Sequence, residues 1–384
     1  MAPPCRVLFC GLIRLLLVIL NKRLTDSVPV LQSQPARCRQ SCRAPLPIWP
    51  LSLRAKLYRN YQEERCLKVL ILLLTVGLLG LSGCTGEPAP VLRVGANIWP
   101  GYEPLYLARD LGYFRGAPIH PVEFTSATQV IRAYQNEAID AVCLTLDEAL
   151  LLASQGADFR IVLAVDFSNG ADVIVGTPGI KSMQDLRARR VGVEDTALGA
   201  FFLTRALQES GMQTGDVRAV PIQVQDHEQA FLSGAVDAVV TFEPVRGKLL
   251  ARGAHILFDS SRIPSEIVDV LLVRTDYLQH HPQAVAALVR GWQRAQDYLT
   301  RSPDDAMARM ARRESVSVAE MREALRGVHL PSREENRQLL SGREPALQPP
   351  LRRLAAFMLQ GKLLRHPVNV DKIIDSQALS MAGQ

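Results

Sequence analysis

The stretch Ala138-Ile139-Asp140-Ala141-Val142 recurs 97 positions later as Ala235-Val236-Asp237-Ala238-Val239. The same offset separates Arg93-Val94-Gly95 from Arg190-Val191-Gly192, without an insertion between the two matches. A repeat that keeps one offset over this length of chain is typical of two related structural units. The chain beyond residue 90 is about 300 residues long, which exceeds the usual size of one core and also favours two units.

Each unit alternates short apolar runs with amphipathic segments. The alternation predicts strands at 91–96, 119–124, 138–144 and 160–165 in the first unit, and at 190–194, 218–224, 236–241 and 255–259 in the second. Helices are expected between these strands. The pattern is typical of an α/β fold with parallel-rich sheets, helices on both faces, and ligands at the carboxyl ends of the strands. Two such sheets facing each other form a cleft.

Two β-branched runs, at 172–177 and 267–274, flank the second unit. We interpret them as strands that cross between two lobes. This interpretation divides the chain into lobe 1 at 91–176 and 268–384, and lobe 2 at 177–267. From Pro282 onward the pattern turns helical, and amphipathic helices are expected at 284–298, 304–312, 318–325 and 351–363. This C-terminal helical segment should complete and brace lobe 1.

The segment 69–84 carries an export pattern. An apolar run follows Arg65 and Lys68 and ends in Leu81-Ser82-Gly83-Cys84. An apolar run that is short for a bilayer span and ends in small residues is typical of a secretory signal. The segment resembles a bacterial lipoprotein signal, in which the cysteine becomes the lipidated first residue. We therefore expect a lipid anchor at Cys84 and a location in the periplasm or at the cell surface, with an uncleaved anchor helix as the alternative.

Residues 1–68 carry twelve Lys and Arg against three acidic residues and include a tract without periodicity. We interpret this segment as an upstream extension that is not part of the mature protein, with a membrane anchor at 7–20 as the alternative. The whole chain carries +6, so residues 69–384 carry 6 − 9 = −3, which removes the support for nucleic-acid binding. After Cys84 one cysteine follows, Cys143, in an apolar run where a buried thiol is expected.

Several motifs along the chain share their order and spacing with one family. They are Gly101-Tyr102-Glu103-Pro104-Leu105-Tyr106-Leu107-Ala108, Gly170-Ala171-Asp172, Thr241-Phe242-Glu243-Pro244 and Val268-Asp269-Val270-Leu271-Leu272-Val273-Arg274. Over about 91–332 the chain resembles the nitrate/sulfonate/taurine-type solute-binding proteins of ABC importers. The resemblance implies the type II periplasmic-binding-protein fold, a monomer without a cofactor, and delivery of a small organic solute to a permease and its ATPase. The fold also occurs in a pyrimidine synthase of thiamine biosynthesis, so an enzyme and a ligand-sensing domain are the alternatives.

Polar and aromatic side chains after the predicted strands define the candidate ligand site. In lobe 1 they are Asn97, Trp99, Tyr102, Glu103, Ser126, Thr145, Asp147, Asp166, Ser168 and Asn169, and in lobe 2 they are Glu194, Thr196, Thr241 and Glu243. Several of them begin helices, where Ser, Thr and Asp also cap exposed N–H groups. His227 is expected at a solvated helix start.

The loops of this candidate site carry acidic residues but neither Lys nor Arg. A bare anion would depend on helix N-termini whose N–H groups the carboxylates already occupy. Trp99, Tyr102, Phe167 and Phe242 offer aromatic walls, and an acid beside an aromatic face suits an amine or amidine group. We therefore expect such a solute rather than nitrate or a simple alkylsulfonate. Metal-ligand spacing, a phosphate loop and a nucleophile elbow are absent from the sequence after residue 84, which favours a binding protein over an enzyme.

Overall fold

The computed structural model describes residues 68–69, 72 and 89–383. The chain divides into two units, 1–86 and 87–384, and almost all of the described residues belong to the second. The alternative anchor at 7–20 and the predicted lipidation site at Cys84 lie outside the described residues. Within the described part, no helix is both long enough and apolar enough to cross a membrane.

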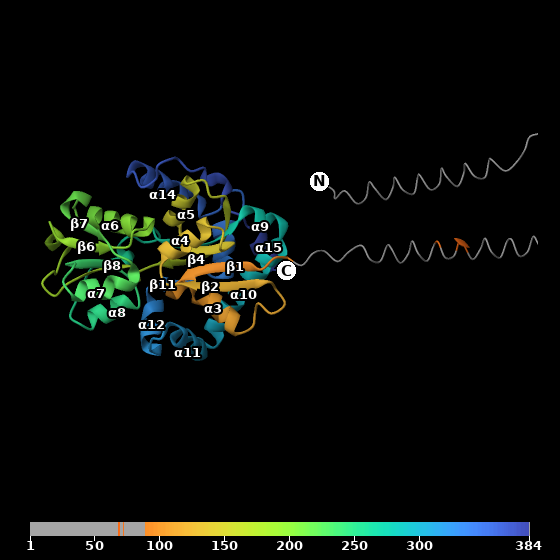
Figure 1. Cartoon of the computed structure of the whole chain (residues 1–384), viewed down its shortest axis with the longest axis horizontal. Helices are drawn as coiled ribbons and strands as arrows, with labels where there is room; N and C mark the ends of the chain where they lie inside the picture. Colours follow the sequence, from red (N-terminus) through yellow and green to blue (C-terminus); the bar gives the residue numbers. More distant parts are fainter. Residues whose placement is uncertain (1–67, 70–71, 73–88, 384) are drawn as a thin grey trace, which may run out of the picture. The chain divides into compact units, whose positions relative to one another are not determined.

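The sheet of lobe 1 has six strands in the order β11-β4-β10-β3-β1-β2. Figure 1 labels four of them, β1, β2, β4 and β11. These strands are β1 (Leu92–Asn97), β2 (Ile119–Phe124), β3 (Ala141–Thr145), β4 (Phe159–Ser168), β10 (Val268–Arg274) and β11 (Val328–His329). Strand β1 pairs in parallel with β2 and β3. Strand β10 runs antiparallel to both of its neighbours, β3 and β4.

The sheet of lobe 2 has five strands in the order β7-β6-β8-β5-β9. These strands are β5 (Val173–Gly176), β6 (Arg190–Val193), β7 (Arg218–Pro221), β8 (Ala238–Thr241) and β9 (His255–Asp259). Strand β6 pairs in parallel with β7 and β8, whereas β5 runs antiparallel to β8 and β9. Each sheet therefore contains an interior strand, β10 or β5, that runs antiparallel to both of its neighbours.

The repeated sequence motif makes the same contacts in both lobes. Arg93 in β1 donates from its backbone N–H and from Nε to Asp140, at 3.0 and 2.9 Å, and Asp140 directly precedes β3. Arg190 in β6 donates in the same way to Asp237 before β8, at 2.9 and 3.2 Å. The paired Arg and Asp thus hold two neighbouring parallel strands in register in each lobe.

Helices pack on the sheets, and Figure 1 shows α6 on one side of the lobe 2 sheet with α7 and α8 on the other. The helices between the strands are α3 (Glu103–Asp110), α4 (Ala127–Gln135), α5 (Leu146–Ser154), α6 (Ala197–Glu209), α7 (His227–Leu232) and α8 (Val245–Leu250). The later helices are α9 (Thr275–His280), α10 (Pro282–Arg301), α11 (Pro303–Glu314), α12 (Val318–Arg326), α13 (Arg333–Leu340), α14 (Gln348–Gln360) and α15 (Gln377–Ala382). Helix α10 packs on α3 and α15, and α13 packs on β4, so the C-terminal helices build on lobe 1.

The chain crosses between the lobes earlier than the sequence predicts. The run 172–177 was expected to cross, but its strand β5 lies inside the lobe 2 sheet because Val173 and Val175 pack into the core of that lobe. The crossing segments are therefore 169–172 and 260–267, which connect β4 to β5 and β9 to β10.

The two crossing segments, 169–172 and 260–267, are bonded to each other, and together they are called the hinge below. The hydroxyl of Ser168 lies 2.7 Å from that of Ser260, and the backbone N–H of Gly170 donates to Ser260 Oγ at 2.7 Å. Gly170 has a φ of 106°, a conformation that favours glycine. Ser168 was predicted as a ligand residue, but its hydroxyl is buried in the hinge.

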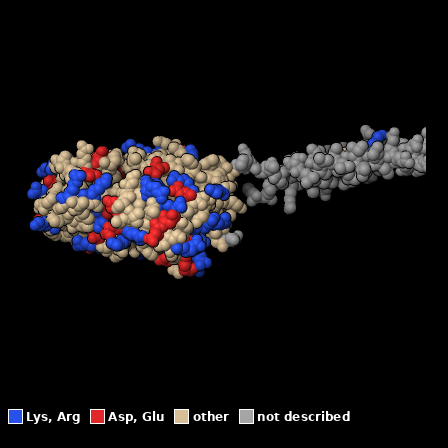
Figure 2. Space-filling model, turned by 90° about the horizontal axis from the view of Figure 1, so that it is seen from below, with Lys and Arg blue, Asp and Glu red and all other residues tan. Residues whose placement is uncertain are grey.

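Charged side chains on the surface are of both signs. Figure 2 shows Lys, Arg, Asp and Glu interspersed over one face of the unit 87–384. Many charged side chains of the described residues are paired, for example Arg352 with Asp371 at 2.9 Å and Arg333 with Asp297 at 2.6 Å. On this face the charges therefore form a mixed surface rather than a continuous basic area.

Candidate functional site

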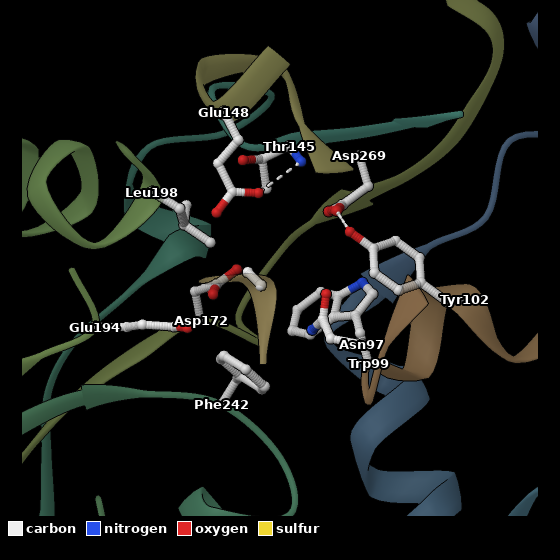
Figure 3. A pocket seen from close by; sticks show the side chains of 11 residues that line it. Asn97, Trp99, Tyr102, Thr145, Glu148, Asp172, Glu194, Leu198, Phe242 and Asp269 are labelled. Atoms are coloured by element: carbon white, nitrogen blue, oxygen red, sulfur yellow. Dashed lines mark hydrogen bonds between the residues drawn. The ribbon is translucent and has the colours of Figure 1, made fainter. Parts of the chain in front are cut away.

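A pocket between the lobes is walled by residues of both (Figure 3). Lobe 1 contributes Asn97, Trp99, Tyr102, Ala127, Thr145, Glu148 and Asp269, and lobe 2 with its first crossing segment contributes Asp172, Glu194, Leu198 and Phe242. The cavity has a volume of about 30 Å³. This volume holds roughly two water molecules. The lobes are therefore closed on each other, and an organic solute needs them to move apart.

The ends of strands from both sheets bring these residues together. Asn97 ends β1, Thr145 ends β3 and Glu194 directly follows β6. Asp172 precedes β5, and Asp269 is the second residue of β10. Because β5 and β10 run antiparallel to their neighbours, they begin at the edge where the other strands end. The sequence analysis considered only the carboxyl ends of strands and so missed both aspartates.

Two contacts across the pocket join the lobes. Glu194 of lobe 2 accepts hydrogen bonds from the backbone N–H and the hydroxyl of Thr128 in lobe 1, at 3.1 and 2.7 Å. Thr128 lies in the first turn of α4, where the helix dipole favours a negative charge. The rings of Trp99 and Phe242 meet edge to face with their centroids 5.4 Å apart. Opening the cleft separates both pairs.

The pocket and its immediate surroundings are rich in buried carboxyl groups. The six acids are Asp147, Glu148, Asp166, Asp172, Glu194 and Asp269, each with 8% or less of its surface exposed. None of the described residues that line the pocket is Lys, Arg or His. Ionised forms of these groups therefore have no cation beside them in the pocket wall.

Burial raises the pKa of these carboxyl groups because a buried charge loses its hydration. It raises the pKa of Glu148 to about 8, and the charges of Asp147 and Glu194 add to the effect. Burial also raises the pKa of Asp172 to about 6, and those of Asp147 and Asp166 to about 7 each. Several of these groups consequently hold protons near neutral pH when the site is without a ligand.

The acids in the pocket wall differ in their hydrogen-bond partners. Asp269 accepts a hydrogen bond from the hydroxyl of Tyr102, and Glu194 is bonded to Thr128. Oε2 of Glu148 accepts from the backbone N–H of Thr145 at 3.3 Å, which caps α5. Among the described residues, Oε1 of Glu148 and Oδ2 of Asp172 have no hydrogen-bond partner. These two oxygens are free to accept from a ligand.

The structure brings five of the predicted site residues into the pocket wall, namely Asn97, Trp99, Tyr102, Thr145 and Glu194. Asp166 lies behind the pocket, where its Oδ2 accepts from the indole N–H of Trp99 at 3.0 Å. Asp147 is also buried beside the pocket. Phe242, which was predicted as an aromatic wall, lines the pocket as well. The sequence analysis missed Ala127, Glu148, Asp172, Leu198 and Asp269.

Glu103 does not face the cleft. Nε of Arg313 in α11 donates to its Oε1 at 2.8 Å, and the same guanidinium reaches Glu123 at 2.6 Å and Glu314 at 3.2 Å. The Arg313 guanidinium also lies 4.1 Å from the centroid of the Tyr106 ring. Glu103 therefore fastens α3 to the C-terminal helices, and its placement at a strand end was misleading because its partner lies 210 residues away.

Most of the remaining predicted residues are bonded within their own lobe, whereas the hydroxyl of Ser126 also reaches across the cleft to Oε1 of Gln223 at 3.5 Å. Ser126 caps α4 by accepting from Gln129 N at 3.3 Å, Thr196 caps α6 by accepting from Gly199 N at 3.2 Å, Thr241 bonds to His227 at 3.2 Å, and Glu243 accepts from Arg246 at 2.8 Å. Asn169 and Phe167 line a different cavity. None of these residues lines the pocket between the lobes.

His227 corrects another expectation. It was predicted at a solvated helix start, but its ring is buried between the hydroxyl of Thr241 and the carbonyl of Ile222. Burial lowers the pKa of His227 to about 4, so the ring is neutral near pH 7. Its role is to hold the start of α7 against β8.

Comparison with known proteins identifies the family of the chain. Residues 85–314, more than half of the chain, match the sequence model of the NMT1-like family. The chain belongs to this family. A putative binding protein of Brucella abortus (strain 2308) is 25% identical to this NMT1-like chain over 216 residues, which are 55% of this chain and 67% of that protein. The taurine-binding periplasmic protein of Escherichia coli (strain K12) is 24% identical over 192 residues, 49% of this chain and 60% of that protein.

Solved structures share the fold of this NMT1-like protein. The alkanesulfonate-binding protein SsuA from Xanthomonas axonopodis pv. citri bound to MOPS has a TM-score of 0.64 at 20% identity, covering 76% of this chain and all of that one. The desulfurization enzyme DSZB has a TM-score of 0.57 at 19% identity, covering 76% of this chain and 98% of that one. The predicted two-lobed periplasmic-binding-protein fold is thus confirmed. Because the fold also occurs in an enzyme, the residues of the pocket are needed to distinguish a binding function from a catalytic one.

Proposed function

We propose that this protein is the extracytoplasmic receptor of an ABC importer, which captures a small organic solute and passes it to permease and ATPase subunits. The observation that carries the proposal is a pocket whose walls come from two lobes joined by two adjacent crossing segments. The printed names of the relatives, a taurine-binding periplasmic protein and an alkanesulfonate-binding protein, support it.

Capture requires that the lobes open and close about the hinge. The closed pocket of about 30 Å³ has no room for an organic solute. Opening at the hinge around Ser168 and Ser260 breaks the bonds of Glu194 to Thr128 and the ring contact of Trp99 with Phe242. Hinged closure then brings the lobes back together with the solute between them.

The chemistry of the pocket favours binding over catalysis. None of the residues that line the pocket is Cys, His, Lys or Ser, so its walls lack a Ser–His or Cys–His pair and an amine that could form a Schiff base. Cys143 lies in β3 with no exposed surface, and burial raises the pKa of its thiol well above the usual range. A thiol in that state is inert. A bound solute should therefore be recovered chemically unchanged.

We propose further that the mature protein is held at the membrane by a lipid on Cys84, as a monomer. The sequence Leu81-Ser82-Gly83-Cys84 and the periplasmic relative support this location. A lipid at that position would keep the two lobes on the side of the membrane where the solute arrives.

The function is tested with the full-length protein and a panel of candidate solutes. Trp99 lies in the pocket wall, so a captured solute should change the tryptophan fluorescence, and Trp99→Phe should remove the change while keeping a ring beside Phe242. Without solute the lobes should interchange between this closed arrangement and open ones, so small-angle scattering on the same samples should show a smaller radius of gyration with solute than without. A deletion strain should lose uptake of the labelled solute. Unchanged scattering at saturation, or uptake that does not need the protein, would contradict the proposal.

A further inference from the structure

Buried acids elsewhere in the chain have a cationic partner. Glu103 and Glu314 are buried, and the guanidinium of Arg313 is bonded to both. The surface mixes both signs, as Figure 2 shows for one face. The pocket between the lobes differs, since four of its eleven lining residues are acidic and none of them is basic. An acidic lining without a counter-ion indicates that the missing cation comes with the ligand.

Two carboxyl oxygens in the wall are unpartnered acceptors. Glu148 and Asp172 are 2% and 3% exposed, and neither Oε1 of Glu148 nor Oδ2 of Asp172 has a hydrogen-bond partner among the described residues. Figure 3 shows both side chains projecting into the same space. A buried acceptor without a donor is costly, so a ligand that donates to both oxygens would be stabilised there.

Helix capping explains the position of one oxygen of Glu148 but not the unpartnered oxygens of Glu148 and Asp172. Oε2 of Glu148 accepts from the backbone N–H of Thr145 and so caps α5. That bond uses one oxygen and directs the other into the pocket. Asp172 lies on the first crossing segment, where its own backbone N–H donates to Ser168 Oγ at 3.2 Å. A ligand bound to Asp172 is therefore bound directly to the hinge.

We infer, on the basis of the proposed capture function, that the cleft recognises a small organic cation whose protonated amine or amidinium group is held between Glu148 and Asp172. Two acceptors match the paired N–H donors of an amidinium group or the ammonium of an amine. Trp99 and Phe242 lie against the same space and offer ring faces to the cation and to its apolar part. A sulfonate or nitrate in this position would face four acidic groups without a basic one. The specificity therefore differs from the one named for the sulfonate-binding relatives.

Matched pairs of opposite charge test this assignment on the full-length protein. Benzamidine is compared with benzenesulfonate, and acetamidine with ethanesulfonate, by calorimetry and by the fluorescence of Trp99. The amidines should bind and the sulfonates should not. The affinity of the amidines should also rise between about pH 6 and pH 8, because the cation displaces protons from carboxyl groups whose pKa burial has raised. The acidic groups that face this space are Glu148, Asp172, Glu194 and Asp269, with Tyr102 beside them, and Asp147 and Asp166 are buried behind them.

Isosteric variants locate the recognition groups. Glu148→Gln keeps an oxygen that can cap α5, and both Glu148→Gln and Asp172→Asn should weaken amidine binding roughly tenfold to a hundredfold. Glu243→Gln is the matched control, since Glu243 lies outside the pocket and is paired with Arg246, and it should leave the affinity unchanged. Circular dichroism of each variant shows that it is folded.

The outcomes separate this inference from the proposed function. Amidine binding that is lost in both pocket variants and kept in the control supports the cation assignment. A sulfonate, nitrate or neutral solute that closes the lobes overturns the assignment and leaves solute capture standing. Amidine binding that survives Glu148→Gln and Asp172→Asn overturns it as well. If no compound of any charge changes the fluorescence or the radius of gyration, both proposals are contradicted.

Discussion

Replacing Glu148 by glutamine should make the ligand-free protein more stable. Burial raises the pKa of Glu148 from its ordinary value of 4.5 to about 8 in the folded state. In the unfolded chain this group ionises above its ordinary pKa, whereas in the folded chain it stays protonated up to about pH 8. The free energy of unfolding therefore falls as the pH rises through this window, because the unfolded state gives up the proton more easily.

The size of the effect follows from the difference between the two pKa values. Each pKa unit corresponds to about 1.4 kcal/mol. A pH near 7 lies about two and a half units above the ordinary pKa of a glutamate, so the carboxyl group of Glu148 lowers the free energy of unfolding by about 3 kcal/mol at that pH. Near pH 5 the same carboxyl group lowers the free energy of unfolding by about 1 kcal/mol or less. Glu148→Gln removes this pH-dependent loss and keeps an oxygen for the N–H of Thr145.

Urea unfolding followed by circular dichroism, at about pH 5 and pH 7, measures this difference. The variant should gain about 3 kcal/mol over the natural protein near pH 7 and little near pH 5. Glu243→Gln, which breaks a contact with Arg246, should not stabilise the protein at either pH. Destabilisation near pH 7 would show that Glu148 is an ionised and paired group in the free protein, and equal stabilisation at both pH values would show that its titration does not lower the stability. Either result would refute the reasoning about the pocket.

Three further predictions address the rest of the molecule. Arg313→Leu leaves Glu103 and Glu314 buried without their cation and should lower the free energy of unfolding by about 3–5 kcal/mol. The control Arg337→Leu removes an exposed ion pair and should lower it by about 1 kcal/mol or less, so similar losses for both variants in urea unfolding would argue against the buried cluster. Glu194→Gln weakens the bond to Thr128 at the start of α4 and should increase the radius of gyration of the ligand-free protein in small-angle scattering; an unchanged radius would show that this bond does not hold the lobes closed. Intact-mass analysis of the membrane fraction should show that the natural mature protein begins at a lipidated Cys84, and Cys84→Ser should abolish this lipidation. An unmodified Cys84 in the natural protein would rule out the lipid anchor.

The spacing of apolar residues along the sequence made much of the fold predictable. The predicted strands at 119–124 and 255–259 coincide with β2 and β9. The repeated Arg and Asp could be found because the same pairing is needed once in each lobe. Helix α13 was not predicted because it buries only Asn336 and Leu340 and so lacks an apolar stripe. The short elements α9, α15 and β11 were missed for a related reason, since a few residues carry little periodic pattern.

The candidate site was less predictable, because it depends on how distant strands are directed. The sequence by itself determined two related α/β lobes, a C-terminal helical brace and an acidic set of strand-end residues, since these depend on local patterns of burial and charge. Tertiary structure alone decided which acids meet. The antiparallel direction of β5 and β10 brought Asp172 and Asp269 to the cleft, and the docking of α11 gave Glu103 to Arg313. Such pairings join residues far apart in the chain, so they cannot be predicted from the local sequence around each residue.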